Sequence, residues 1–209
     1  MKKLSIATVV ALSLGTVPWA ASAAAGGTFL RVEGGQVRYD ISKKRNNDRF
    51  AQAYGLTAGY RWNVSAPLAL GVETGFVNMG KLDDRQSGML TDTSGTKRNA
   101  LLRTEVGARA YLLGANVRWA FAPRWSLNGR LGLAHMRTRV WGDLKAEGTT
   151  AQHRKVLVKN SAYMGAGVNY AVTSNVDLGI NVASYSANGL GSKNRSNVNV
   201  FGISAEVRL

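Results

Sequence analysis

Hydrophobic and polar residues alternate with a period of two along most of the chain beyond residue 26, which is the pattern of half-buried β-strands. The alternation is clearest in the segment 54–62, where one face carries Tyr54, Leu56, Ala58, Tyr60 and Trp62. The positions between them are glycine, threonine and arginine. The pattern predicts eight strands, over 28–39, 50–63, 67–80, 104–121, 126–141, 156–172, 176–187 and 197–209.

The predicted connections between these strands alternate in length. Tight turns are expected over 64–66, 122–125 and 173–175, and longer polar loops over 40–49, 81–103, 142–155 and 188–196. Short turns at one rim and long loops at the other are typical of an up-and-down bacterial barrel. An even number of strands places both chain ends at the short-turn rim, which is the periplasmic side of such barrels.

The composition of the polar face indicates whether the polar side chains point into the barrel or away from it. A water-soluble barrel would expose many long charged side chains on that face, but here it is dominated by Gly, Ala, Ser, Asn and Thr with single charges. Small residues suit the narrow interior of an eight-stranded barrel. We therefore expect an all-β, eight-stranded, antiparallel, up-and-down transmembrane β-barrel with its apolar face towards lipid. In the last strand Val198 and Val200 fall with the polar set, which indicates a bulge or a position near the loop rim.

The aromatic residues indicate the two membrane interfaces. Near the short-turn ends the sequence places Tyr60, Trp62, Trp119, Phe121, Trp125 and Tyr170, and near the long-loop ends Phe76, Trp141 and Tyr163. Two such belts are expected of a membrane barrel, although aromatic residues are also common in any strand.

The first residues resemble an export signal. Met1-Lys2-Lys3 precedes an apolar run and the tripeptide Ala21-Ser22-Ala23, which is the order of a secretory signal peptide and its cleavage site. We expect residues 1–23 to be the signal peptide, cleaved after Ala23, and 24–209 to be the barrel. Together with the strand pattern, this predicts the outer membrane of a Gram-negative bacterium.

The chain is strongly basic, with a net charge of +15. Such an excess attracts polyanions, and export makes nucleic acid an improbable partner, so the phosphates of lipopolysaccharide are the expected anions. Candidate anion contacts in or near the predicted loops are Lys43, Lys44, Arg45, Lys97, Arg98, Arg137 and Arg139. An acidic host polymer is an alternative ligand, and solvated loop charges without a ligand are the simplest explanation.

Several charges fall on the inward face. The candidates for a lumen charge network are Arg61, Glu73, Arg118 and Arg130, with Arg31, Glu33 and Glu206 as further inward charges. A charge in a narrow lumen needs a partner because isolated buried charges are very costly. We expect Glu73 to pair with one or more of the arginines. The network would then be a polar plug that fixes the strand register or, alternatively, a gated conduit.

No catalytic or metal-binding constellation is evident in the sequence. The chain has two histidines, His135 and His153, and neither has a serine and an acid at strand spacing, as a nucleophilic site would require. Cysteine is absent, so zinc is not expected, and Asp83, Asp84 and Asp92 would hold calcium only loosely. We expect no cofactor, no metal and no enzymatic activity.

Three segments resemble the OmpA-like transmembrane domain. These are YGLTAGYRWNVSAPLALGVETGFVNMG (54–80), ANVRWAFAPRWSLNGRLG (115–132) and GAGVNYAVTSNVDLGINVASY (165–185). The closing strand FGISAEVRL is similar to the one that the barrel-assembly machinery reads in that family, with Leu209 in place of the usual terminal aromatic residue. The resemblance implies that Glu73 is the family's inward carboxylate, while Asn169 stands where a later carboxylate is expected. It covers the transmembrane domain alone, without a peptidoglycan-binding domain.

Taken together, these features predict a structural and surface role in the outer membrane, with basic extracellular loops in contact with lipopolysaccharide. A narrow pore for ions or small solutes is one alternative. A loop-mediated adhesin or resistance factor is another. A lipid A-modifying enzyme would require one of the histidines to lie beside a serine and an acid.

Overall fold

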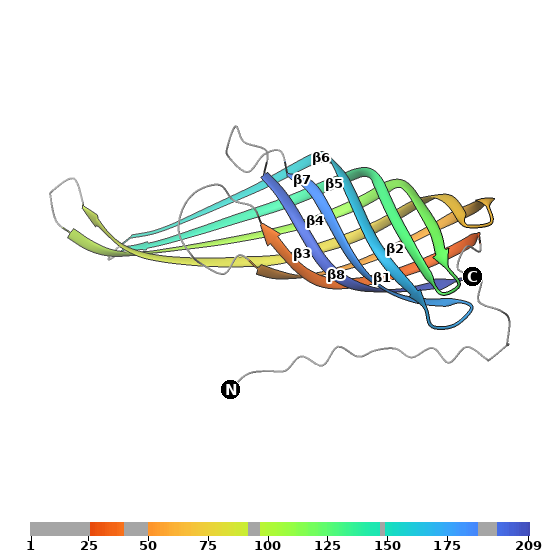
Figure 1. Ribbon diagram of the computed structural model, residues 1–209. Coiled ribbons are helices and arrows are strands. Elements are labelled where there is room, and N and C mark those ends of the chain that lie inside the picture. The colour runs from red at the N-terminus through yellow and green to blue at the C-terminus, as the bar shows by residue number, and fades with distance from the viewer. Residues whose placement is uncertain (1–25, 40–49, 92–96, 147–148, 188–195) are drawn as a thin grey trace.

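The chain folds into eight antiparallel strands that close into a barrel (Figure 1). The computed structural model describes residues 26–39, 50–91, 97–146, 149–187 and 196–209. The strands are β1 (Gly27–Tyr39), β2 (Phe50–Ser65), β3 (Leu68–Thr91), β4 (Lys97–Ala122), β5 (Trp125–Ala146), β6 (Thr149–Ala171), β7 (Val176–Ala187) and β8 (Ser196–Arg208). Each pairs with its neighbour in sequence, and β1 pairs with β8. The predicted fold class is confirmed.

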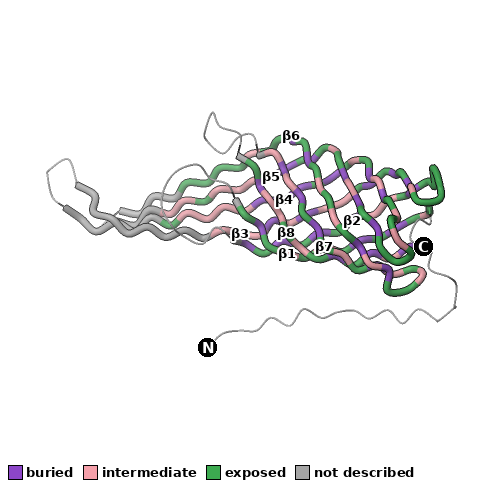
Figure 2. Tube along the Cα trace, in the orientation of Figure 1, coloured by how far each residue is buried: buried purple, intermediate pink, exposed green. Residues whose placement is uncertain are grey.

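The apolar face of every strand lies on the outside. Exposed and buried residues alternate along the barrel strands (Figure 2). Ile180 and Ile203 are 72% and 70% exposed, whereas Arg61 and Glu73 are each 2% exposed. Other exposed apolar side chains are Leu30, Leu56, Leu70, Leu113, Leu131 and Met164. A continuous apolar exterior of this kind requires an apolar surrounding, so the predicted orientation is confirmed. Among the described residues, no helical segment has the length and hydropathy of a membrane span.

Aromatic rings gather on the outer surface at the short-turn rim. The ring pairs are Tyr60–Trp62, Trp119–Phe121 and Trp125–Tyr170, with centroids 5.2, 6.1 and 5.0 Å apart. At the other end Phe76 packs against Tyr111. The second predicted belt is partly wrong: Tyr163 is 1% exposed and points into the lumen, because it shares the parity of the inward Ser161 and Asn169.

Glycine allows the strands to approach closely at the seam between β1 and β8. Gly35 and Gly202 lie opposite each other in the register. A Cβ atom on Gly35 would overlap the carbonyl oxygen of Phe201, and one on Gly202 would overlap that of Gly34. Backbone atoms cannot swing aside as a flexible side chain can, so the narrow lumen requires the inward glycine here.

Beyond the barrel, four strands continue as an open sheet. The predicted loops 81–103 and 142–155 are wrong over most of their length, since β3 and β4 pair as far as Thr91 and Lys97, and β5 and β6 as far as Ala146 and Thr149. We call residues 81–91, 97–107, 139–146 and 149–158 the projecting sheet, which extends to the left of the barrel in Figure 1. Both faces of such a sheet lie outside the membrane-spanning wall, so its strands need no apolar alternation and the sequence pattern misses them.

A bulge marks the point where β3 leaves the barrel wall. The β3–β4 register shifts between Asn78 and Lys81, and Gly80 has a φ of 70° in the left-handed region that favours glycine. The Gly80 amide donates a hydrogen bond of 3.0 Å to Oδ1 of Asn78. Pairing between β2 and β3 ends at Tyr54 and Asn78. Because bulges bend a strand, this one separates the projecting sheet from the barrel.

The first residues of β8 continue the ladder without a bulge. Val198 pairs with Tyr39 on β1 and Tyr185 on β7, and both registers run uninterrupted from there. Val198 is 2% exposed and points inward. The apparent break in the sequence pattern therefore reflects a change in the lumen, whose interior becomes apolar at this height.

Candidate functional site

The lumen consists of an ionic half near the short-turn rim and an apolar half near the projecting sheet. The apolar plug comprises Val37, Ala51, Ala53, Val77, Met79, Ala108, Ala110, Leu112, Ala134, Met136, Tyr163, Ala183, Tyr185 and Val198. Tyr163 and Tyr185 stack with centroids 5.9 Å apart. A small cavity between the two halves, lined in part by Glu33, Asn181 and Tyr185, has room for only a few water molecules. The plug thus separates the ionic half from the end that carries the projecting sheet.

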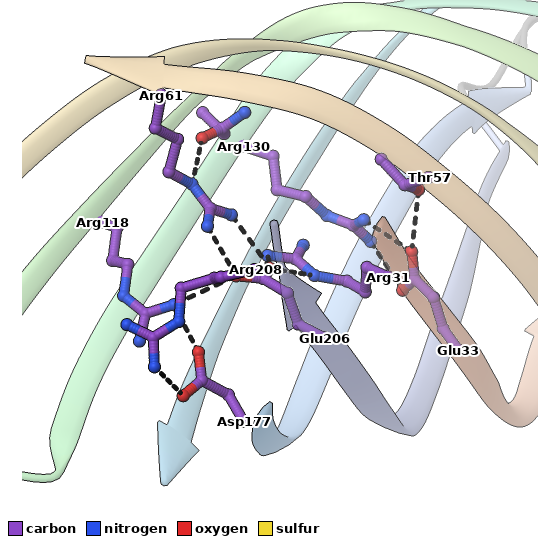
Figure 3. A network of polar contacts seen from close by, with 10 residues as sticks. Arg31, Glu33, Thr57, Arg61, Arg118, Arg130, Asp177, Glu206 and Arg208 are labelled. Carbon is purple, nitrogen blue, oxygen red and sulfur yellow. Dashed lines mark hydrogen bonds and ion pairs between the residues drawn. The ribbon is translucent and has the colours of Figure 1, made fainter. Parts of the chain in front are cut away.

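Glu206 is the centre of the ionic half (Figure 3). Its carboxylate accepts hydrogen bonds from Arg31 at 2.6 Å, from Arg61 at 2.5 Å and from Arg118 at 3.0 Å. The three arginines come from β1, β2 and β4, and each is no more than 2% exposed. The Arg61 guanidinium also lies 3.8 Å from the ring centroid of Phe29. One buried carboxylate therefore connects β8 to the adjacent β1 and, across the lumen, to β2 and β4.

Asp177 and Glu33 complete the ionic half. Asp177 accepts hydrogen bonds from Arg118 at 2.6 Å and from Arg208 at 3.0 Å. Arg130 forms a bidentate ion pair with Glu33, with N–O distances of 2.6 and 2.9 Å. Charge-assisted pairs with this geometry are the strong ones. Asp177 is not among the predicted lumen residues, although its parity with Gly179 and the inward Asn181 is the signal that could have identified it.

The prediction that Glu73 pairs with an arginine is wrong. Its Oε1 accepts a hydrogen bond of 2.8 Å from the hydroxyl group of Tyr163, and within the described part of the chain no ion pair to Glu73 is found. The register explains this, since the neighbours of Glu73 on β2 and β4 are Gly59 and Gly114. The Arg130 guanidinium is held by Glu33 instead.

All four predicted lumen residues face inward, but they do not form one cluster. Arg61 and Arg118 meet at Glu206, while Arg130 and Glu73 have separate partners. Asn169, where the resemblance implied a missing carboxylate, is 2% exposed. Several buried polar atoms beside the network have no protein partner within the described residues, namely Ser126 Oγ, Asn116 Nδ2, Asn128 Nδ2 and Oδ1, Asn169 Nδ2, and Asn181 Nδ2 and Oδ1. Buried polar groups of this kind are normally satisfied by ordered water.

Two of the predicted anion contacts, Arg137 and Arg139, have described side chains, and they lie towards the projecting sheet. Lys43, Lys44 and Arg45 lie outside the described residues. Lys97 and Arg98 begin β4, so their placement in a loop was wrong, and their side chains lie outside the described part. Arg137 is exposed and Arg139 half-buried, both on the outer face of β5.

The histidines are separated from each other and from catalytic partners. His135 Nδ1 lies 2.7 Å from Oδ1 of Asn160 on the outer face, and its other cross-strand neighbour is Tyr111. His153 is exposed on β6 opposite Gly142. The residues that the structure describes contain no group of three or more histidine, cysteine or acidic side chains placed to hold a metal ion.

An apolar exterior, aromatic rings at its rims and a charged interior define a closed transmembrane β-barrel. The sequence profile described as "Outer membrane protein beta-barrel domain" matches residues 7–208. The chain belongs to this family and is a bacterial outer-membrane protein, and the resemblance to OmpA-like barrels is confirmed. A search of curated proteins finds no match.

Solved structures share the fold at low sequence identity. The attachment invasion locus protein Ail of Yersinia pestis is 15% identical, with 88% of this chain and 99% of that chain covered and a TM-score of 0.53. Ail in complex with the heparin analogue sucrose octasulfate is 16% identical, with 88% and 99% covered and a TM-score of 0.51. The outer membrane protease OmpT from Escherichia coli is 10% identical, with 88% and 94% covered and a TM-score of 0.51. Because these relatives include both a protease and an attachment protein, the fold alone assigns no activity.

Proposed function

We propose that this protein is a structural, non-enzymatic component of the outer membrane, a sealed barrel whose basic extracellular end contacts lipopolysaccharide. The observation that carries the proposal is the filled lumen. The apolar plug occupies the extracellular half, and paired arginines and carboxylates occupy the other half. A conduit for ions would need a continuous polar path, and the plug interrupts it.

Planar-bilayer recordings test the sealed barrel against the narrow pore. The refolded protein should give no stable unitary current in symmetric salt, because permeating ions would have to be desolvated among Val77, Met79 and Met136. Reproducible single-channel steps of fixed size, sensitive to Glu206→Gln, would instead establish the pore.

Cleavage after Ala23 and recognition of β8 by the barrel-assembly machinery stay predictions. The adhesin also stays a prediction, and segment 81–103, the longest of the predicted loops, forms much of the projecting sheet. A host-ligand binding assay with and without residues 82–106 would decide it, since equal binding by both proteins would exclude a role for this hairpin.

A further inference from the structure

Two arginines face each other directly on the outer wall of the barrel. Arg109 on β4 and Arg137 on β5 are Cα partners in the register, and both are exposed. Arg139 follows Arg137 on the same face of β5. Like charges directly opposite each other destabilise a sheet. Such an arrangement is favourable when an anion lies between the guanidinium groups.

Within the described part of the chain, carboxylates do not neutralise this pair. On the outer face of the projecting sheet, the acids with described side chains are Glu105 and Asp143. Glu105 forms an ion pair of 2.6 Å with Lys81, and Asp143 lies opposite Arg103 in the register. No ion pair involving Arg109, Arg137 or Arg139 occurs among the described residues. Their charges are available to an external anion.

The pair lies two outward rows above side chains that face the apolar surroundings of the barrel. The next outward row towards the membrane contains Phe76, Tyr111 and His135, and the row beyond that contains Leu113 and Leu133, which are 67% and 63% exposed. Two residues along a strand span about 7 Å. The arginines therefore lie two rows, or about 14 Å along the tilted strands, from side chains that face acyl chains, a separation that suits a phosphate in the headgroup layer.

The surroundings of the pair suit a glycolipid. Val158 and Val156 on β6 lie opposite Arg137 and Arg139, and both are exposed on the outer face. Just beyond them Arg154 lies over the ring of Trp141, 5.0 Å from its centroid. Arginines beside apolar side chains can bind the phosphate group of a glycolipid with bidentate hydrogen bonds, while the apolar part of the glycolipid packs against the apolar side chains.

Among the described outward residues at this height, the basic side chains gather on one side of the barrel. Outward positions at the corresponding height of β1, β2, β7 and β8 are Gln36, Arg38, Gln52, Ser184, Ser186, Asn197 and Asn199. Arg38 is the single charge among them. A ligand attracted by charge is therefore expected at the β4–β6 wall and not around the whole circumference.

We infer that Arg109, Arg137 and Arg139 form a binding site for a phosphate group of lipid A, the membrane anchor of lipopolysaccharide, on the β4–β6 wall. The inference rests on the proposed contact with lipopolysaccharide and assigns it to one face and three residues. Arg109 and Arg137 hold the phosphate oxygens between them, and Arg139 adds a third cation. Val156 and Val158 contact the apolar part of the same molecule.

Lipid A titration of the purified barrel tests the site. The variant Arg109→Gln/Arg137→Gln/Arg139→Gln removes the three charges at similar side-chain length. The matched control, Arg38→Gln/Arg124→Gln/Lys155→Gln, removes three exposed charges elsewhere. Thermophoresis would measure affinity for bisphosphorylated lipid A, for dephosphorylated lipid A and for inorganic phosphate. Altered mobility on heating in electrophoresis would verify that each variant is folded.

We expect the site variant to bind bisphosphorylated lipid A roughly tenfold or more weakly than wild type, since charge-assisted hydrogen bonds are lost. The control variant should bind like wild type. The affinity of wild type for dephosphorylated lipid A should be as low as that of the site variant for bisphosphorylated lipid A. Inorganic phosphate should not saturate the wild-type protein. Equal affinity of wild type and the site variant would overturn the site but leave lipopolysaccharide contact elsewhere. No binding of lipid A by wild type would overturn both.

Discussion

Replacing Glu206 with glutamine is expected to destabilise the barrel by about 3–5 kcal/mol, the cost of removing one partner from a buried ion pair. The Glu206 side chain is 2% exposed and accepts hydrogen bonds from three arginines. Without the negative charge of Glu206, Arg31 and Arg61 each lose their ion-pair partner. Arg118 keeps Asp177. The loss therefore leaves buried positive charge that the lumen cannot solvate.

Urea unfolding in lipid vesicles, followed by tryptophan fluorescence, would measure this loss. Glu105→Gln is the matched control, because it breaks the pair with Lys81, whose side chain is 71% exposed, and should change stability by at most about 1 kcal/mol. Glu73→Gln should also cost much less than Glu206→Gln, since it removes no ion pair and the amide oxygen can still accept from Tyr163. Equal effects of the substitutions at Glu206 and Glu105 would contradict the role given to Glu206.

Placing an arginine on the lipid-facing wall at Ile203 is expected to cost about 2–4 kcal/mol. Ile203 is 70% exposed and lies between Gly34 and Ile180 in the register, midway along the apolar part of β8. In water, an exposed isoleucine replaced by arginine would be nearly neutral or stabilising. The large cost arises only if acyl chains surround the side chain.

Val64 provides the control for depth. It is 59% exposed at the short-turn end of β2, so Val64→Arg should cost no more than about 1 kcal/mol, as expected near the interface. The difference between the two variants in free energy of unfolding, measured in vesicles, reports how deep position 203 lies in the bilayer. If both substitutions leave the unfolding midpoint unchanged, the outer wall does not face lipid.

The parity of the strands was predictable because burial on one face imposes a period of two. Arg61, Glu73, Arg118 and Arg130 were placed inside on this basis, and all four are buried. The same rule places Tyr163 and Asp177 inside, although neither was identified there. The alternation along a strand predicts whether a side chain points inward or outward. It does not predict which strands lie opposite each other across the lumen.

The pairing of charges could not be predicted for this reason. Arg61 and Glu206 are separated by 145 positions and meet across the lumen, and such a contact depends on barrel closure and stagger. The projecting sheet was missed for a different reason. The segments 81–91 and 97–103 are rich in Asp, Ser, Arg and Lys, and strands held by backbone ladders outside the membrane leave no apolar alternation for pattern analysis to detect.

The outward side chains of the barrel are expected to touch lipid, and site-directed spin labels test this directly. The chain has no cysteine, so a single spin label can be attached at Ile203→Cys and, in a second protein, at the adjacent Ser204→Cys. Ser204 is 6% exposed and faces the lumen. In lipid vesicles the label at position 203 should collide freely with oxygen dissolved in the acyl chains and hardly at all with a water-soluble nickel chelate, while the label at 204 should be immobilised. A label at 203 that collides with the nickel chelate and is shielded from oxygen would contradict the account.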